Sequence, residues 1–299
     1  MKGYIQKAET LIEALPYIRE FNGKTVVVKY GGAAMAGDDR MASFAEDIVL
    51  LQFVGIRPVV VHGGGPQIDR VLAALKIPSE RKSGLRVTSP EAMEVVEMVL
   101  GGTVNKKIVA LINKFGGRAV GLTGKDGDLI RARKLFASGP DGAAIDLGLV
   151  GDVTDVRPAV IRTLEADGFV PVIAPIGAGP DGQAYNINGD TAAAEVAAAL
   201  GAEKLILLTD VEGVKDKGGG LVSTMTVDAA TAAIRAGVIT GGMIPKVECG
   251  LTALRKGVRK VHVLDGRVPH SVLLEIFTDA GIGTEITRDG GEGQADAER

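Results

Sequence analysis

Residues 25–32 have the sequence Thr-Val-Val-Val-Lys-Tyr-Gly-Gly, and residues 58–66 have the sequence Pro-Val-Val-Val-His-Gly-Gly-Gly-Pro. Each stretch is a short run of β-branched residues followed by glycines, which predicts a buried strand that ends in a tight turn. Helical patterns at residues 44–53 and 66–75 follow the two runs. Buried strands that alternate with amphipathic helices predict an α/β fold with a mostly parallel sheet covered on both faces.

Further apolar runs are expected to extend this sheet. They lie at residues 119–122, 169–176, 204–208 and 260–264. Residues 131–155 alternate short apolar pieces with turn residues, which predicts a hairpin outside the main sheet. Because such sheets bind ligands at the carboxyl ends of their strands, we expect the site in the loops that follow these runs.

Composition excludes several classes of protein. The chain has 299 residues, 46% of them hydrophobic, and 34 Lys and Arg against 37 Asp and Glu. This balance argues against a nucleic-acid partner or a polybasic membrane binder. The N-terminal segment carries charges throughout, and no run of about 18 apolar residues occurs, so neither a secretory signal nor a membrane span is expected. With a single cysteine, Cys249, the protein is expected in the cytoplasm.

The first candidate site is Lys29, at the end of the strand predicted for residues 25–30. A lysine in that position is unfavourable unless its ammonium group meets a negative charge, and Gly31 and Gly32 would let a ligand approach backbone N–H groups. A surface lysine before an ordinary turn explains the pattern equally well.

The second candidate is the turn His62–Pro66. Its three glycines expose N–H groups where a strand meets a helix, and Pro66 suits the first helical position. Because a helix N-terminus carries partial positive charge, the turn predicts an anion site. The alternative is a tight turn with no ligand. The three histidines of the chain lack the spacing of metal ligands, and no metal site is expected.

Two further loops precede helices. Asp190 follows Asn-Ile-Asn-Gly at residues 186–189 and is expected to cap the next helix, while the two amides face one side of the loop and hold a polar ligand. Lys246 ends Thr-Gly-Gly-Met-Ile-Pro-Lys, again at a helix start. Thr209 and Asp210 end another strand and are expected to face a nucleotide.

Six motifs in fixed order resemble those of the amino-acid kinase family. Between Asn22 and Ile286 they are K-Y-G-G, V-H-G-G-G-P, G-L-R-V-T, N-I-N-G-D, L-T-D-V-E-G and G-G-M-I-P-K. G-L-R-V-T at residues 84–88 favours the acetylglutamate branch. The resemblance implies a three-layer αβα sandwich, with a substrate lobe at residues 22–200 and an ATP lobe at residues 201–299. The tail from residue 288 is polar and is expected to be disordered.

The resemblance also implies ATP-dependent phosphorylation of the γ-carboxylate of N-acetyl-L-glutamate to N-acetyl-L-glutamyl 5-phosphate, in arginine biosynthesis, with Mg²⁺ held mainly by the ATP phosphates. Lys29 and Lys246 would stabilise the transferring phosphoryl group, and Asp190 would position both lysines. The residues implied to bind acetylglutamate are Gly64, Gly65, Arg86 and Asn186. Those implied to bind the nucleotide are Gly31, Gly32, Thr209, Asp210 and Gly242. Gly189 departs from the pattern expected of most members of the family, which is alanine at this position.

Residues 1–21 form an extra amphipathic segment with Pro16 as an expected kink. Its apolar stripe either folds back on its own lobe or is exchanged between subunits. The segment resembles the arginine-inhibited branch, a hexameric trimer of dimers, which implies feedback inhibition by L-arginine. The residues implied for the arginine site are Lys217, His262, Glu275 and Gly281. A PII-type signal protein as partner stays open, as do a different carboxylate or carbamate acceptor and a non-catalytic arginine sensor.

Overall fold

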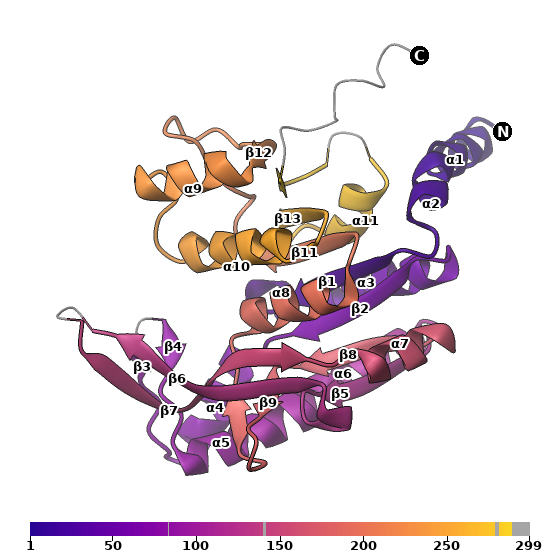
Figure 1. Cartoon of the computed structure of the whole chain (residues 1–299). Coiled ribbons are helices and arrows are strands. Elements are labelled where there is room, and N and C mark those ends of the chain that lie inside the picture. The colour runs from indigo at the N-terminus through magenta and orange to yellow at the C-terminus, as the bar shows by residue number, and fades with distance from the viewer. Residues whose placement is uncertain (83, 140–141, 279–280, 289–299) are drawn as a thin grey trace.

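A single large sheet runs through the molecule and confirms the predicted α/β class. The computed structural model describes residues 1–82, 84–139, 142–278 and 281–288. Figure 1 shows the sheet between two helical layers, as predicted for a three-layer sandwich. All its strand pairs are parallel except β13 with β14. In sheet order its eight strands are β12 (Thr224–Thr226), β14 (Thr284–Thr287), β13 (Lys260–Asp265), β11 (Lys204–Thr209), β1 (Thr25–Tyr30), β2 (Arg57–His62), β8 (Val170–Ala174) and β5 (Ala119–Thr123).

Strand β1 shows why these residues form a central strand. Val26, Val27 and Val28 are completely buried. Because successive side chains point to opposite faces, Tyr30 lies on the face of Val28, and Lys29 on the face of Val27. A strand that is apolar on both faces is stable only between two covering layers.

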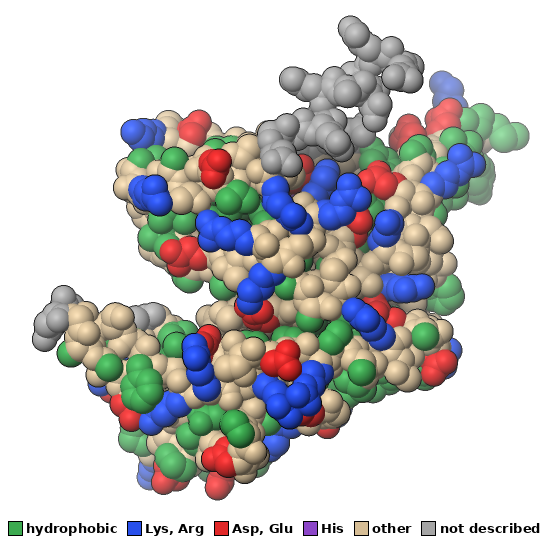
Figure 2. All heavy atoms as spheres, in the orientation of Figure 1, with side chains coloured by type: hydrophobic (Ala, Val, Ile, Leu, Met, Phe, Trp, Pro, Cys, Tyr) green, Lys and Arg blue, Asp and Glu red, His purple; other side chains and the backbone are tan. Residues whose placement is uncertain are grey.

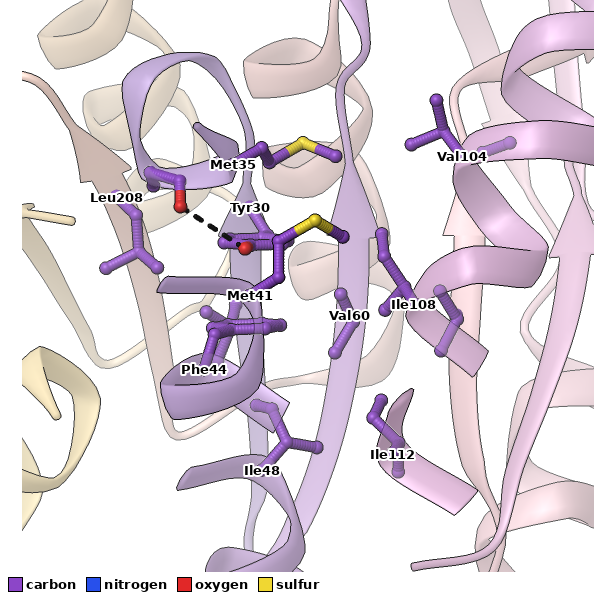
Figure 3. Close-up of a cluster of buried hydrophobic side chains, with 14 of the residues drawn as sticks. Tyr30, Met35, Met41, Phe44, Ile48, Val60, Val104, Ile108, Ile112 and Leu208 are labelled. Atoms are coloured by element: carbon purple, nitrogen blue, oxygen red, sulfur yellow. Dashed lines mark hydrogen bonds between the residues drawn. The ribbon is translucent and has the colours of Figure 1, made fainter. Parts of the chain in front are cut away.

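The helices divide between the two faces of the sheet. Figure 3 shows the core on the Tyr30 face, where the ring of Tyr30 stacks on that of Phe44. The helices on this face are α3 (Asp38–Phe53), α4 (Gly65–Ala74), α5 (Pro90–Glu97), the π-helix η2 (Met98–Val104), α6 (Asn105–Lys114) and α11 (Ser271–Ile276). The helices on the Lys29 face are α7 (Ala159–Ala166), α8 (Gly189–Leu200), α9 (Val227–Arg235) and α10 (Met243–Arg255). Two 3-10 turns, η1 (Gly32–Met35) and η3 (Asp126–Asp128), follow β1 and β5.

The predicted hairpin is confirmed beside the main sheet. Strands β6 (Ile130–Ser138) and β7 (Ala144–Val156) pair antiparallel and close a small barrel with β9 (Ile176–Ala178) and β10 (Ala184–Asn186). Residues 140 and 141 of its turn lie outside the described residues. A two-residue ladder joins β3 (Arg81–Lys82) to β4 (Leu85–Arg86).

The N-terminal segment projects from the body of the molecule (Figure 1). Helices α1 (Lys2–Glu13) and α2 (Leu15–Phe21) are separated at Ala14, and Pro16 lies in the first turn of α2. No residue of α1 is buried, and Leu11 and Ile12 are largely exposed, so α1 does not fold back on its own lobe. Among the described residues, no helix is long and apolar enough to cross a membrane.

Gly201 ends α8 in the left-handed conformation, which glycine adopts without strain as a C-cap. The division into two lobes near this residue stays a prediction. The predicted disordered tail lies, beyond Arg288, outside the described residues.

Candidate active site

The carboxyl ends of β1 and β2 and the start of α8 enclose a cavity of about 320 Å³. Figure 2 shows this side of the molecule hollowed between the part that carries α9 and α10 and the β6–β7 hairpin. The predicted site residues that line the cavity are Lys29, Gly32, Gly64, Gly65, Arg86, Asn186 and Asp190. The topology therefore brings together residues from four separate sequence motifs at the strand ends where a ligand was expected.

Two lysines share one carboxylate at this cavity. Asp190 Oδ1 lies 2.8 Å from Lys29 Nζ, and its Oδ2 accepts a hydrogen bond from Lys246 Nζ at 3.0 Å. The side chains of Lys29 and Asp190 are only 10% and 11% exposed. Burial by itself would raise the pKa of Asp190, but the two ammonium groups outweigh burial and hold that pKa below its ordinary value. The site thus keeps two cations and one anion next to a cavity.

Asn188, and not Asp190, caps α8, so the predicted cap was wrong. The Asn188 Oδ1 accepts hydrogen bonds from the backbone N–H groups of Asp190 at 2.8 Å and Thr191 at 3.2 Å. Asn188 thereby satisfies the orphan N–H groups of the helix start. The carboxylate of Asp190 is left to pair with the lysines.

Glycines bring two loops into direct contact. The backbone N–H of Gly63 donates to the carbonyl of Tyr30 at 2.8 Å, and a Cβ on Gly31 would lie 3.3 Å from the Gly63 nitrogen. A Cβ on Gly64 would lie 2.5 Å from Leu100 Cδ2, so the buried Leu100 side chain would have to move to admit it. Gly32 has φ of +62°, which glycine adopts without strain. The glycines therefore allow the backbones of the two turns to approach each other beside Lys29.

Gly189, the departure from the family pattern, is not required by space. A Cβ there would lie 3.6 Å from Lys29 Cε and 3.8 Å from the Gly63 Cα, both ordinary contacts. Gly189 begins α8 behind the Asn188 cap. An alanine is therefore compatible with this backbone.

Arg86 is buried with its guanidinium next to the glycine turn. Its Nη2 donates to the Gly65 carbonyl at 3.2 Å, and its Nη1 donates to Asp69 and Ser79. The hydrogen bond from Arg86 holds the pKa of Asp69 below its usual range. Sequence reasoning missed Asp69, although it lies four residues after Gly65 and so one helical turn further along the same face.

Asn186 at the end of β10 connects two motifs. Its Nδ2 donates to Thr88 Oγ1 at 3.3 Å, and Thr88 Oγ1 donates to the Arg86 carbonyl at 2.9 Å. The amide thus lies against the segment that carries Arg86. Asn188 lines the same cavity.

His62 supports the glycine turn from the other side of the sheet. Its Nδ1 lies 2.9 Å from the Gly63 carbonyl, and Asn105 Nδ2 lies 3.1 Å from its Nε2. These partners assign the proton to Nδ1 and the acceptor role to Nε2. Burial lowers the pKa of His62 to about 4, so the ring is neutral at pH 7. Sequence reasoning missed Asn105, which is completely buried at the start of α6.

Of the predicted nucleotide residues, Thr209, Asp210 and Gly242 do not line this cavity. Thr209 ends β11, where its Oγ1 accepts from the Val211 N–H at 3.1 Å, and Asp210 follows in an exposed turn. Gly242 directly precedes α10, which carries Lys246. A second cavity of about 220 Å³ lies between these two segments and is lined by Val211, Gly213, Val214, Lys215, Asp216, Val238, Ile239, Thr240 and Met243.

Of the predicted arginine-site residues, three lie together. His262 Nδ1 is 2.5 Å from Glu275 Oε1, and Gly281, with φ of +57°, leads into Ile282, whose N–H donates to Glu275 Oε2 at 3.0 Å. Lys217 lies in an exposed loop, and no contact within the described ranges joins it to the other three.

A different lysine, Lys204, lies near this group and was missed by sequence reasoning. It is buried, and burial followed by neighbouring Lys260 lowers its pKa, while Glu275 acts in the opposite direction. Its Nζ lies 4.8 Å from the centroid of the aromatic ring of Phe21, and Phe21 is the last residue of α2. The N-terminal segment is thereby anchored next to His262 and Glu275.

In the part of the chain that the structure describes, no three His, Cys, Asp or Glu side chains gather as a metal site. The arrangement is suited to a ligand with phosphates, because cations and open backbone N–H groups converge on one cavity.

Comparisons with known proteins show the family of the chain. Residues 24–265 match the model of the family described as "Amino acid kinase family". An acetylglutamate kinase of Syntrophobacter fumaroxidans is 57% identical over 289 residues, which cover 95% of this chain and 97% of the relative.

Two solved structures of N-acetylglutamate synthase from Neisseria gonorrhoeae are similar in fold. The first, complexed with coenzyme A and N-acetyl-glutamate, has a TM-score of 0.82 and 29% identity, covering 95% of this chain and 64% of the synthase. The second, complexed with coenzyme A and L-arginine, has a TM-score of 0.80 and 28% identity, covering 95% of this chain and 66% of the synthase. This chain therefore spans about two thirds of the synthase.

Proposed function

The chain belongs to the amino acid kinase family and is a kinase, and from this premise we propose that it transfers the γ-phosphoryl group of ATP to the γ-carboxylate of N-acetyl-L-glutamate. The observation that carries the proposal is the convergence of Lys29 and Lys246 on Asp190 at the cavity, at 2.8 Å and 3.0 Å. The product would be N-acetyl-L-glutamyl 5-phosphate, an intermediate of arginine biosynthesis made in the cytoplasm. Relatives named acetylglutamate kinase that match nearly the whole chain support this substrate.

The proposed reaction needs no general base. The γ-carboxylate is ionised at neutral pH, and one of its oxygens forms a bond to the γ-phosphorus as the bond from that phosphorus to the β–γ bridging oxygen breaks. ADP leaves with that bridging oxygen. Catalysis then depends on alignment and on stabilising negative charge on the transferring group. Lys29 and Lys246 supply the positive charge that stabilises this group, and Asp190 keeps their ammonium groups close together.

The acceptor is proposed to lie against the glycine turn. Arg86 donates to the α-carboxylate, because a guanidinium can offer two parallel N–H groups to a carboxylate. The backbone N–H groups of Gly64 and Gly65 and the Asn186 amide contribute further hydrogen bonds. This placement directs the γ-carboxylate toward Lys29.

The nucleotide is proposed to lie on the side of α10. The Gly31–Gly32 turn faces the phosphates, and the cavity of about 220 Å³ between Asp210 and Gly242 receives the base. Mg²⁺ enters with ATP and is held mainly by phosphate oxygens and water.

The experiment that tests the proposal measures ADP release by the purified protein with Mg·ATP and N-acetyl-L-glutamate, with L-glutamate and L-aspartate as control acceptors. Turnover that depends on acetylglutamate is expected. Turnover with another acceptor alone would overturn the substrate and keep the kinase. Failure with every acceptor would favour a non-catalytic sensor.

We further propose that L-arginine inhibits this enzyme at the group formed by His262, Glu275 and Gly281. Glu275 offers the carboxylate that a guanidinium prefers. The similar fold of a synthase complexed with L-arginine supports the idea. Lys217 is retained in the proposal as a fourth residue, although no contact among the described residues joins its exposed loop to the other three. Activity that is unchanged at millimolar arginine would contradict it.

The exposed apolar residues of α1 support a proposed hexamer in which this helix packs against a second subunit. Leu11 and Ile12 are 73% and 68% exposed, so a partner would bury apolar surface that the monomer leaves in water. The molar mass in solution tests this assembly: a monomer with intact α1 would contradict it, and removal of residues 1–21 should lower the mass.

A further inference from the structure

Asp69 connects α4 to the segment that carries Arg86. Its Oδ1 accepts hydrogen bonds from Arg86 Nη1 and, at 3.3 Å, from Ser79 Oγ. Its Oδ2 accepts from Arg81 Nη2 at 3.2 Å. Ser79, Arg81 and Arg86 all lie in the stretch that follows α4. One carboxylate thus holds three donors from this stretch next to the cavity.

These contacts fix the orientation of Arg86. Its side chain is only 4% exposed, and its Nη2 donates to the Gly65 carbonyl at 3.2 Å. A guanidinium has five N–H groups, and the contacts found among the described residues use two on Nη1 and one on Nη2. The others are available to an anion in the cavity. If the plane of Arg86 were not held, these donors would not stay directed toward one position.

The negative charge of Asp69 would by itself weaken binding, because an aspartate close to the cavity repels an anionic ligand. The side chain of Asp69 is 45% exposed, so water screens this repulsion. The pKa of Asp69 lies below its usual range because of the hydrogen bond from Arg86, so the carboxylate is ionised at neutral pH. Water weakens the repulsion between Asp69 and an anionic ligand but leaves the hydrogen bond from Arg86 to Asp69 in place. The effect of Asp69 on the orientation of Arg86 therefore outweighs its repulsion of the ligand.

We propose that Asp69 is a positioning residue that sets acceptor specificity, by holding Arg86 where it receives the α-carboxylate of the acceptor. The inference rests on the proposed function, because it takes N-acetyl-L-glutamate as the acceptor. Asp69 acts through Arg86 and takes no part in the transfer step.

The test compares Asp69→Ala with Asp69→Asn in steady-state kinetics, using N-acetyl-L-glutamate and its α-carboxamide as acceptors. Asp69→Ala should raise the KM for acetylglutamate about 10- to 100-fold, the usual range for one charge-assisted hydrogen bond. The kcat and the KM for ATP should change by less than about twofold, since the phosphate side is intact. The loss should be smaller with the α-carboxamide, so the preference for the free α-carboxylate falls.

Asp69→Asn removes the charge but keeps an acceptor oxygen for Arg86, so it should lose less than Asp69→Ala. Asp152→Ala is the matched control, because Asp152 also pairs with an arginine, Arg133, at 3.0 Å, and Arg133, unlike Arg86, does not line the cavity. It should leave all kinetic constants unchanged. Thermal unfolding of each variant shows whether it is folded. If Asp69→Ala does not fold, a lower preference of Asp69→Asn for the free α-carboxylate supports the inference, and an unchanged preference contradicts it.

Several outcomes would overturn the inference. Equal effects of alanine and asparagine, or a lower KM for acetylglutamate, would mean that Asp69 acts by charge. Equal losses on both acceptors would mean a merely structural role. Absence of wild-type turnover with acetylglutamate would instead refute the proposed function, and it is seen before any variant is measured.

Discussion

Lys29 and Tyr30 are neighbours in β1, yet their side chains lie in two different cavities on opposite faces of the sheet. The cavity at Lys29 has about 320 Å³, and the cavity at Tyr30 has about 240 Å³. At Lys29, two ammonium groups share one carboxylate beside open glycine turns. At Tyr30, stacked rings form the wall and a buried aspartate, Asp47, meets His270 at 2.6 Å.

The difference lies in the groups that line the two cavities. Both cavities contain ionisable groups, but only the Lys29 cavity combines unbalanced positive charge with backbone N–H groups that a phosphate can reach. On the Tyr30 face, burial raises the pKa of Asp47 to about 6, against the opposing effect of His270.

The largest expected effect separates the two neighbours directly. Lys29→Ala should lower kcat by about 10²–10³, or about 2.7–4 kcal/mol, by analogy with the loss of one donor to a developing negative charge. Tyr30→Phe loses only the hydrogen bond from Tyr30 Oη to the Ala34 carbonyl, 3.2 Å long, and should keep kcat within about twofold. Steady-state ADP release measures both. Similar losses of kcat in the two variants would contradict the assignment of catalysis to the Lys29 face alone.

A second prediction concerns pH on the Tyr30 face. The folded-state pKa of His62, about 4, lies below its unfolded value of 6.5, so the unfolded chain binds the proton more tightly between these values. The free energy of unfolding should therefore fall by about 3 kcal/mol as pH falls from 6.5 to 4. His62→Gln should lack this contribution.

Urea unfolding at several pH values tests the prediction, with the wild-type minus variant difference as the readout. That difference removes the titration of all shared groups. A difference that does not vary with pH would show that His62 titrates normally in the folded protein.

Asp47 should give the opposite slope. Its folded-state pKa of about 6 exceeds the ordinary 3.8, so the folded protein binds the proton more tightly between these values. Its contribution to the free energy of unfolding is present at low pH and decreases by about 3 kcal/mol as pH rises from 3.8 to 6. Asp47→Asn should remove this decrease in the same urea series. Equal slopes for variant and wild type would contradict a raised pKa.

The smallest expected effect belongs to the Lys29 face. Gly189→Ala places a methyl group 3.6 Å from Lys29 Cε without a clash, and should stabilise the protein by about 0.4–1 kcal/mol by restricting the unfolded chain. The midpoint of urea unfolding should rise with an unchanged slope. Activity within about twofold of wild type is expected. A tenfold loss would show that the lysines need the glycine.

Local sequence was sufficient for the strands and the glycine turns. The valine run in β1 is apolar at every position, which in a short segment is compatible with a strand buried on both faces. The three glycines after His62 indicated an anion site because so many N–H groups are rarely exposed at one helix start. Both features depend on residues that are adjacent in the chain.

Local sequence was not sufficient where two explanations used the same residues. Asp190 and Asn188 are both residue types that cap helices well. The structure shows that Asn188 is the cap and that the carboxylate of Asp190 pairs with a lysine from a distant strand. In the sequence, Lys204 looks like an ordinary strand residue. Its contact with Phe21 depends on α2, a helix that lies far from it in the sequence.

The sequence by itself therefore determined the parallel α/β sheet and the motifs from which a site is built, because periodicity, glycine and charge act over a few residues. The order of those motifs gave the resemblance to the family. Only the tertiary structure decided that Lys29, Asp190 and Lys246 meet, that Asp69 holds Arg86, and that Lys217 lies apart from His262. Hydrogen bonds and ion pairs between distant segments depend on ångström-scale placement, and the packing of the sheet and its two helical layers sets that placement.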